Sequence, residues 1–215
     1  MNDRSDTQVM EPPPRVMRRS QAIRRSEAEA AILQAAADIL AERGLERLTL
    51  ADVGEAAGYS RGLPAHYFGS KEGLTAALAR HIVRGFGHHL LHTEKHPPGL
   101  ARLLGTVALY LDSTAKSPTG TRALFVVLGE ALTDEGLRKE IAVLNARSVT
   151  SLADDIKAGV VTGEIRKGLN AKAEASLILG GLRGIAALWL NDPERIDLKA
   201  LRNAFVAGLK RSLAP

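Results

Sequence analysis

The most constraining feature of this chain is the segment 32–74, in which glycines separate short stretches of helical apolar periodicity. The first stretch repeats apolar residues every three to four positions, a spacing that only a helix brings onto one face. Gly44 follows and supplies the left-handed backbone on which helices commonly end. Thr49 and Asp52 then mark a helix start, because a threonine hydroxyl caps free amides and a carboxylate suits the positive helix end. The pattern predicts a second helix over about 50–57.

A third, very short helix is expected directly after the turn that Gly58 permits. Ser60 can cap this helix, Leu63 is its apolar anchor, and it ends near Phe68. Ser70 opens a long fourth helix. Two short helices joined by a glycine turn have the geometry that places the second one in a DNA major groove. Small helical proteins of other kinds contain the same pattern, so on its own it leaves both interpretations open.

The residues GYSRGLPAHYFGSKEGL, at positions 58–74, add specificity because they resemble the N-terminal domain of the TetR family of bacterial transcriptional regulators. The resemblance extends back to Ile32. It implies a recognition helix over 61–66, with Arg61, Gly62 and Leu63 at its exposed start. The residues that it places against DNA phosphates are Thr49, Ser60, Tyr67 and Lys71.

Two residues depart from the family pattern. Ala65 stands where tyrosine is most frequent, so the usual phenolic contact would have to come from His66 or Tyr67. Pro64 lacks an amide hydrogen, which a helix tolerates only within about its first turn. We therefore expect a DNA-reading helix whose individual base contacts the resemblance does not fix.

Five arginines and no acidic residue lie just before the first helix. Such a segment can follow the phosphate backbone or enter a narrow minor groove. Because three prolines precede it, we expect it to be disordered in the free protein. The prediction is a basic DNA-binding arm over 1–25, and the alternative is a solvated tail without ordered contacts. The arginines are Arg15, Arg18, Arg19, Arg24 and Arg25.

Composition restricts the remaining classes of protein. The formal net charge is +5, which suits a nucleic-acid partner. The absence of cysteine excludes disulfides, thiolate metal sites and cysteine nucleophiles. No apolar run approaches 18 residues and no apolar segment follows a basic start, so we expect a cytoplasmic protein that is neither secreted nor membrane-spanning.

The rest of the chain reads as helices throughout, because β-branched alternation is absent. We expect helices over 100–114 and 121–132, one capped by Thr133 that stops near Gly163, one over 170–190, and a last one from about Asp197. The fold class is therefore all-α with about nine helices. A helix-turn-helix domain over 26–75 would precede a ligand-binding and dimerisation domain over 76–215.

The helix over 170–190 carries an unusual number of small residues. Glycine in a helix interior costs about 1 kcal/mol relative to alanine, and close helix packing is the natural compensation, within the subunit or against a second copy. The segment GLRGIAALWLNDP also resembles the dimerising segment of the TetR family, so we expect a homodimer. The expected interface residues are Gly180, Gly181, Gly184, Leu188, Leu201, Phe205 and Leu209.

The resemblance implies a small-molecule pocket among the middle helices of the second domain. Tyr110, Phe125 and Trp189 are scarce aromatic residues there, and Arg122 and Arg183 could pair with an anion. Each of these side chains also fits an ordinary core or surface position. If Leu, Val and Ala line the pocket, the effector is apolar or amphipathic.

Histidines form the one group that could support chemistry. His81, His88 and His92 fall within about 40° of one another on the fourth helix and could bind Zn²⁺ or Ni²⁺. A polar helix face between two domains explains the same residues, and Pro97 and Pro98 end the helix soon afterwards. The sequence contains no HExxH or phosphate-binding loop. Solvated charge is the ordinary explanation for Asp38, Glu42, Glu55, Asp154 and Asp155.

These patterns predict a homodimer that inserts two recognition helices into successive major grooves of a palindromic double-stranded DNA site. The resemblance implies that a small molecule in the second domain changes the spacing of the two readers, most often relieving repression. We expect no catalytic residue, cofactor or metal. The alternatives are a helical small-molecule-binding protein or enzyme with a subsidiary DNA-binding domain, and a protein that coats DNA without sequence preference.

Overall fold

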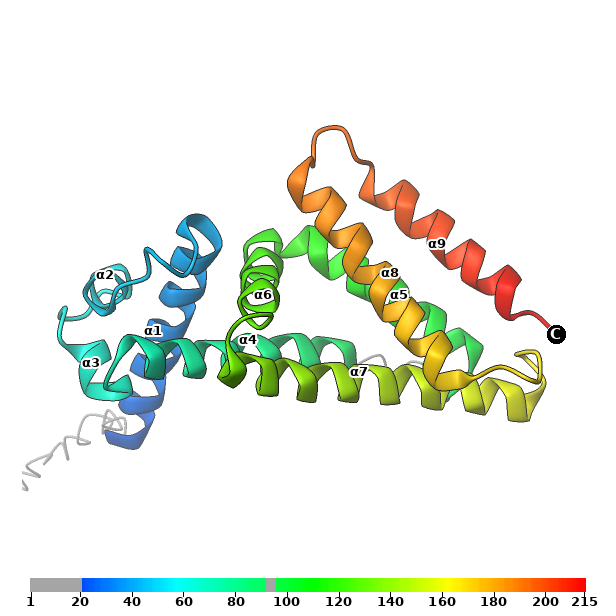
Figure 1. The fold of residues 1–215 in the computed structure, drawn as a ribbon, viewed down its shortest axis with the longest axis horizontal. Helices are drawn as coiled ribbons and strands as arrows, with labels where there is room; N and C mark the ends of the chain where they lie inside the picture. Colours follow the sequence, from blue (N-terminus) through cyan, green and yellow to red (C-terminus); the bar gives the residue numbers. More distant parts are fainter. Residues whose placement is uncertain (1–20, 92–95) are drawn as a thin grey trace, which may run out of the picture.

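The computed structural model describes residues 21–91 and 96–215, and within these ranges it is built from nine α-helices without a strand (Figure 1). The expected all-α class is therefore confirmed. The helices are α1 (Gln21–Arg43), α2 (Leu50–Ala56), α3 (Leu63–Phe68), α4 (Lys71–Leu91), α5 (Leu100–Lys116), α6 (Pro118–Glu130), α7 (Glu135–Thr162), α8 (Ala171–Asn191) and α9 (Leu198–Leu213).

Side-chain caps start several helices where the sequence predicts them. The Thr49 hydroxyl accepts a hydrogen bond from the Asp52 amide at 3.1 Å and begins α2. Ser70 accepts one from the Gly73 amide at 3.2 Å at the start of α4. Asn170 and Asp197 cap α8 and α9 in the same way. These bonds are local, so a short sequence pattern is enough to locate them.

Other helix starts differ from the expectation. The expected Ser60 cap is wrong, because α3 begins after Gly62 without any side-chain cap. Asp134, not Thr133, caps α7, with its carboxylate 2.8 Å from the Leu137 amide. The predicted start of α6 is three residues late, since Pro118 opens the helix. Proline suits this position because the first helical amide has no partner to lose.

The expectation of a disordered arm over 1–25 is wrong for its last five residues. Helix α1 begins at Gln21, so Arg24 and Arg25 lie in its first turns. The other arginines of the expected arm, Arg15, Arg18 and Arg19, lie outside the described residues.

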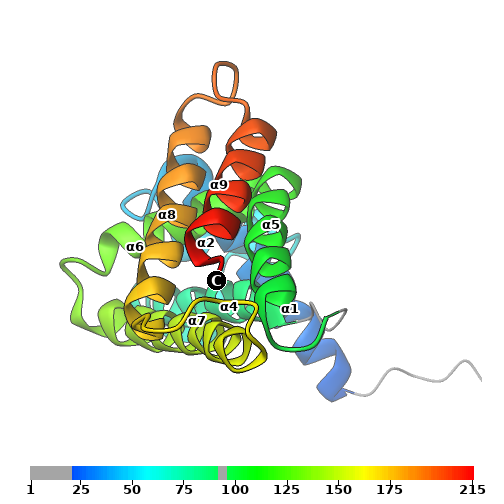
Figure 2. The same cartoon turned by 90° about the vertical axis from the view of Figure 1, so that its right-hand side faces the viewer.

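The helices form two groups at opposite ends of the molecule. Helices α1 to α3 lie at one end, and α5, α8 and α9 at the other, while α4 and α7 run alongside each other between them (Figure 1). Seen along the long axis, α8, α9 and α5 stand side by side above α7 (Figure 2). Helix α6 packs across α1 and connects the two groups.

Two hydrophobic cores follow from this arrangement. The first joins α1, α2 and α4 to α6 and the beginning of α7, through buried residues such as Leu40, Leu78 and Leu124. The second joins α5, the rest of α7, α8 and α9, through residues such as Leu103, Ile156 and Leu182. The core of the N-terminal helices therefore does not end near residue 75 but continues into α6 and α7.

One helix in the described part of the chain, α8, is long and apolar enough to cross a membrane by length and composition alone. Its buried face supplies Ala175, Ile178, Leu182 and Ala186 to the second core. Part of its apolar character is thereby explained by packing within the subunit.

Candidate functional site

The turn between α2 and α3 is tight because Gly54 lets the two elements touch. A Cβ atom on Gly54 would lie 2.6 Å from the carbonyl oxygen of Ser60 and 3.1 Å from Cδ of Pro64. Any larger residue would push α3 away from α2. Sequence reasoning missed Gly54, although a glycine inside a short helix is itself a signal of close backbone approach.

The residues at the beginning of α3 are open to solvent. Arg61, Gly62 and His66 are exposed. The Arg61 Nε lies 3.7 Å from a carboxylate oxygen of Glu55, and both side chains are about 70% exposed. A solvated pair of this kind is weak, so Arg61 is readily available to another anion. Leu63, expected at the exposed start of the helix, is instead half-buried and packs against the first core.

The first turns of α1 are fastened to the end of α3. The Tyr67 hydroxyl donates a hydrogen bond to the Arg25 carbonyl oxygen at 3.4 Å, and the Arg25 guanidinium lies 5.7 Å from the centre of the Tyr67 ring. Gln21, Arg24 and His66 complete a recess of about 310 Å³ around this contact. The structure thus brings together four of the predicted DNA-binding residues, and none of the described residues that line the recess is acidic.

Lys71 has a contact that the sequence did not reveal. Its ammonium group donates a hydrogen bond to the Glu46 carbonyl oxygen at 2.9 Å, which ties the start of α4 to the loop between α1 and α2. An ammonium group has three donors, so this bond leaves donors for a phosphate. Thr49 likewise accepts a bond from Asp52 and retains its hydroxyl hydrogen.

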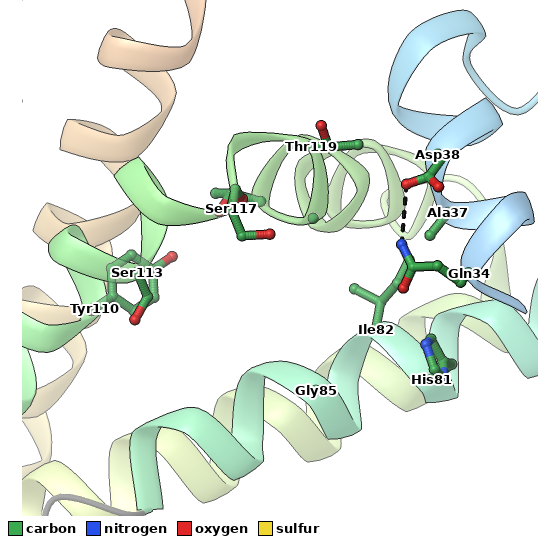
Figure 3. Close-up of a pocket in the computed structure, with 12 residues that line it drawn as sticks. Gln34, Ala37, Asp38, His81, Ile82, Gly85, Tyr110, Ser113, Ser117 and Thr119 are labelled. Carbon is green, nitrogen blue, oxygen red and sulfur yellow. Dashed lines mark hydrogen bonds between the residues drawn. The ribbon is translucent and has the colours of Figure 1, made fainter. Parts of the chain in front are cut away.

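A cavity of about 320 Å³ lies where α1, α4, α5 and α6 meet, and we call it the junction cavity. In Figure 3, Gln34 and Asp38 of α1 lie on one side, Tyr110 and Ser113 of α5 on the other, and Ile82 of α4 between them. The cavity wall therefore includes residues of α1, from the N-terminal group of helices, and residues of α5, from the group at the opposite end. The remaining lining residues are Ala37, His81, Gly85, Ser117, Thr119, Gly120 and Thr121.

The charge within the junction cavity is negative. Asp38 accepts a hydrogen bond from the Gln34 amide at 3.1 Å, and among the described lining residues it is the one carboxylate. Asp38 is half-buried and stands on the cavity wall, so its carboxylate faces the cavity as well as solvent. Burial, and secondarily the charge of Arg84, lowers the pKa of the His81 imidazole, so His81 is neutral at pH 7.

The predicted ligand-binding residues do not share one pocket. Tyr110 lines the junction cavity, whereas Phe125 and Arg183 line a second pocket of about 600 Å³ between α6, α7 and α8. Arg122 is exposed and lies 3.5 Å from the Leu190 carbonyl oxygen. Trp189 packs against the second core. Gln34 and Asp38 were missed because they belong to α1, which the sequence assigns to DNA reading alone.

The outer face of α8 and α9 carries small and apolar residues. The ring of Phe205 lies 2.7 Å from where a Cβ on Gly181 would be, so Gly181 serves packing within the subunit. Gly180 and Gly184 have open space instead, and Leu177 and Leu188 beside them are 70% and 57% exposed. Leu201, Phe205 and Leu209 are half-buried, and exposed residues of α9 that the sequence did not single out are Ala200, Ala204 and Ala207.

The described residues contain no group of three histidine, aspartate or glutamate side chains that could hold a metal ion. Of the histidine group, His81 faces the junction cavity. His92 and the side chain of His88 lie outside the described part of the structure.

Comparison with known proteins agrees with this architecture. Residues 32–78 match the family of bacterial regulatory proteins called the tetR family, and residues 99–214 match the C-terminal domain of BetI-type transcriptional repressors. The HTH-type transcriptional regulator BetI of Burkholderia lata is 29% identical over 150 residues, which cover 66% of this chain and 76% of that protein.

Solved structures show the same fold. A crystal structure from Rhodococcus sp., assigned to the TetR family of transcriptional regulators, is 26% identical and covers 88% of this chain and 100% of its own, with a TM-score of 0.75. A regulator from Saccharomonospora viridis in complex with choline is 19% identical, covers 88% and 99% of the two chains, and has a TM-score of 0.79. The chain described here therefore belongs to the TetR family of bacterial regulatory proteins, which are transcriptional regulators and not enzymes.

Proposed function

We propose that this protein is a cytoplasmic homodimeric repressor that binds a palindromic DNA operator and is released by a small-molecule effector. The observation that carries the proposal is the junction cavity, because its walls belong both to α1 of the DNA reader and to α4, α5 and α6. A molecule in this cavity would touch the reader and the body of the protein at once.

The basic surface around α3 supports DNA binding. Arg61 is exposed two residues before α3, His66 is exposed on α3, and Arg24 and Arg25 lie beside the end of that helix. Phosphate contacts from arginine and lysine supply most of the affinity, while the side chains that reach base edges supply the specificity. We assign base reading to Arg61 and His66, and phosphate binding to Thr49, Ser60, Lys71 and the α1 arginines. Tyr67 joins the phosphate contacts when its hydroxyl exchanges the Arg25 carbonyl oxygen for a phosphate oxygen.

The outer face of α8 and α9 supports dimerisation. Gly180 and Gly184 leave an open stripe between exposed leucines, and small residues allow helices to approach to about 8 Å. A second copy on this face would form a four-helix bundle. Its two-fold symmetry would present two readers, which suits half-sites about 34 Å apart on the duplex.

Coupling between effector and DNA follows from the packing of α6 on α1. An effector that enlarges the junction cavity would displace α1 or α4 and thereby change the spacing of the two readers. It can release DNA only if it binds the released arrangement more tightly than the DNA-bound one. A coupling of about 1 to 3 kcal/mol, typical of such linked sites, gives a several-fold to hundred-fold response.

The lining of the cavity narrows the class of effector. Leu, Val and Ala do not dominate the described lining, since hydroxyl and amide groups surround the apolar surface of Ala37, Ile82 and the Tyr110 ring. Asp38 is the one formal charge in the part of the lining that the structure describes, because the lowered pKa of His81 keeps that ring neutral at pH 7. We therefore propose an amphipathic effector that is uncharged or cationic. The choline complex of the Saccharomonospora viridis regulator supports a small-molecule ligand in this fold.

Selection of bound fragments from a random DNA pool tests the proposal. We expect a two-fold symmetric consensus with half-sites one helical turn apart. Absence of enrichment would favour the alternative of a small-molecule-binding protein in which the DNA reader is subsidiary. The selected operator can then be used to screen amphipathic amines and neutral compounds for release, with Asp38→Asn as the variant expected to lose the response to cations.

A further inference from the structure

The second pocket, between α6, α7 and α8, differs in charge from the junction cavity. Two arginines, Arg138 and Arg183, line it together with Asn145, and no aspartate or glutamate is among its described lining residues. Its apolar surface comes from residues such as Phe125 and Leu128. We call this volume of about 600 Å³ the arginine pocket, and its size is within the range of small-molecule sites.

Arg183 is distinctive among the partly buried arginines of the C-terminal helices. Arg102 and Arg202 each have a carboxylate partner at 2.6 Å, Asp155 and Asp112 respectively. Arg183 instead donates to the amide oxygen of Asn145 at 2.6 Å, and no carboxylate of the described residues lies within 4 Å of it. A half-buried guanidinium thus keeps its positive charge without an anion to balance it.

The environment of Arg183 adds to this imbalance. Its Nε is buried and has no hydrogen-bond partner among the described residues. Burial lowers the pKa of the guanidinium, and the nearby Tyr110 hydroxyl only partly counteracts this. Arginine remains protonated even so, and its planar fork matches a carboxylate or a phosphate better than it matches a single amide oxygen.

We propose that the arginine pocket binds an amphipathic anion, whose carboxylate or phosphate head pairs with Arg183 and whose apolar chain lies along Phe125 and Leu128. Arg138 is placed to contribute at the rim, since two of its nitrogens donate to the carbonyl oxygens of Ala131 and Leu132 and others remain available. The exposed Leu132 side chain continues the apolar surface outward. The arginine pocket is a different site from the junction cavity. Its proposed ligand is an anion, whereas the effector proposed for the junction cavity is uncharged or cationic.

Isothermal titration of the full-length protein without DNA tests the site. The probes are decanoate and monodecyl phosphate, with decyltrimethylammonium as a cation of the same chain length and inorganic phosphate as an anion without a chain. We expect one or both of the anionic amphiphiles to bind, and inorganic phosphate not to bind. The cation has its own proposed site in the junction cavity, so it should not displace a bound anion from the arginine pocket. Displacement of the anion by the cation would overturn the proposal, because it would show adsorption of the chain alone.

Variants locate the site. Arg183→Met should weaken anion binding about 10- to 100-fold, the loss expected for a charge-assisted hydrogen bond. Arg147→Met, at an exposed position of the same α7 that carries Asn145, is the matched control and should bind normally. Ala142→Trp fills the pocket from an exposed lining position and should abolish binding even if Arg183→Met does not fold. Unchanged binding by Ala142→Trp, or no anion binding by the natural protein, would refute the site without bearing on DNA recognition.

Discussion

At the scale of single residues, the Arg61 side chain on the DNA-reading surface is only weakly restrained. Arg61 is paired only with the solvated carboxylate of Glu55. Replacing Arg61 with alanine should change the preference among operator variants, because an arginine on a base edge contributes about 1 to 3 kcal/mol of discrimination. Competition between operator variants in a fluorescence-anisotropy titration would measure this change.

Glu55→Gln is the counterpart, and it should raise affinity for every DNA sequence by removing a negative charge beside the reader. If Arg61→Ala instead weakened all operators equally, Arg61 would be a phosphate contact and not a base reader.

Lys71 combines two functions that can be separated by measurement. As a phosphate contact, its replacement by alanine should reduce the slope of log affinity against log salt by about one unit for all sequences. Lys71 also donates to the Glu46 carbonyl oxygen, so the substitution should remove one exposed hydrogen bond. The unfolding free energy should fall by about 1 kcal/mol or less, and the melting temperature should fall with it.

Lys71→Ala should therefore change both the salt slope and the melting temperature. Lys116→Ala, a lysine at the end of α5, is the control and should leave the salt slope unchanged. A lower melting temperature with an unaltered salt slope would assign Lys71 to structure alone.

At the scale of helices, the exposed stripe of α8 governs assembly. Replacing Gly180 and Gly184 with leucine should block close approach of a second copy, although each change favours the helix itself by up to about 1 kcal/mol. Sedimentation velocity should show monomers that keep their melting temperature at low concentration. Thr150→Leu, exposed on α7, should remain dimeric. A double variant that still forms dimers would place the interface elsewhere.

The helices also show what a sequence can and cannot predict. The starts of α2, α8 and α9 follow from caps that lie within four residues, so local patterns located them. The start of α3 does not, because the close contact at Gly54 sets the turn and no side chain caps the helix. The candidate DNA-binding site also includes predictable features. The basic residues near α3 could be predicted, since one motif contains most of them.

The two pockets could not be predicted, because their walls come from helices far apart in the sequence. Asp38 and Ser113 face one cavity although 75 positions separate them. A polar residue on a helix surface looks solvated until the packing of another helix is known. Tyr110 lines one pocket and Arg183 lines the other. Which pocket each residue lines likewise depends on how α5 to α8 are arranged in space.

At the scale of the whole molecule, the reader depends on helices that belong to the other half of the chain. The first core includes Leu124 of α6, which is 2% exposed, whereas Leu103 of α5 is 0% exposed in the second core. Truncating either leucine to alanine should cost about 2 to 5 kcal/mol of unfolding free energy. Because both substitutions truncate a buried leucine to alanine, the two variants compare damage to the first core with damage to the second.

Amide hydrogen exchange should therefore distinguish the two substitutions. Leu124→Ala should accelerate exchange in α1 to α3 and weaken operator binding, since α6 supports α1. Leu103→Ala should accelerate exchange first in α5, α8 and α9 and leave the reader protected. Uniform acceleration in both variants would mean that the cores unfold together. In that case a ligand in the junction cavity could not loosen the reader alone, and control of DNA binding would require a rigid movement of the whole subunit.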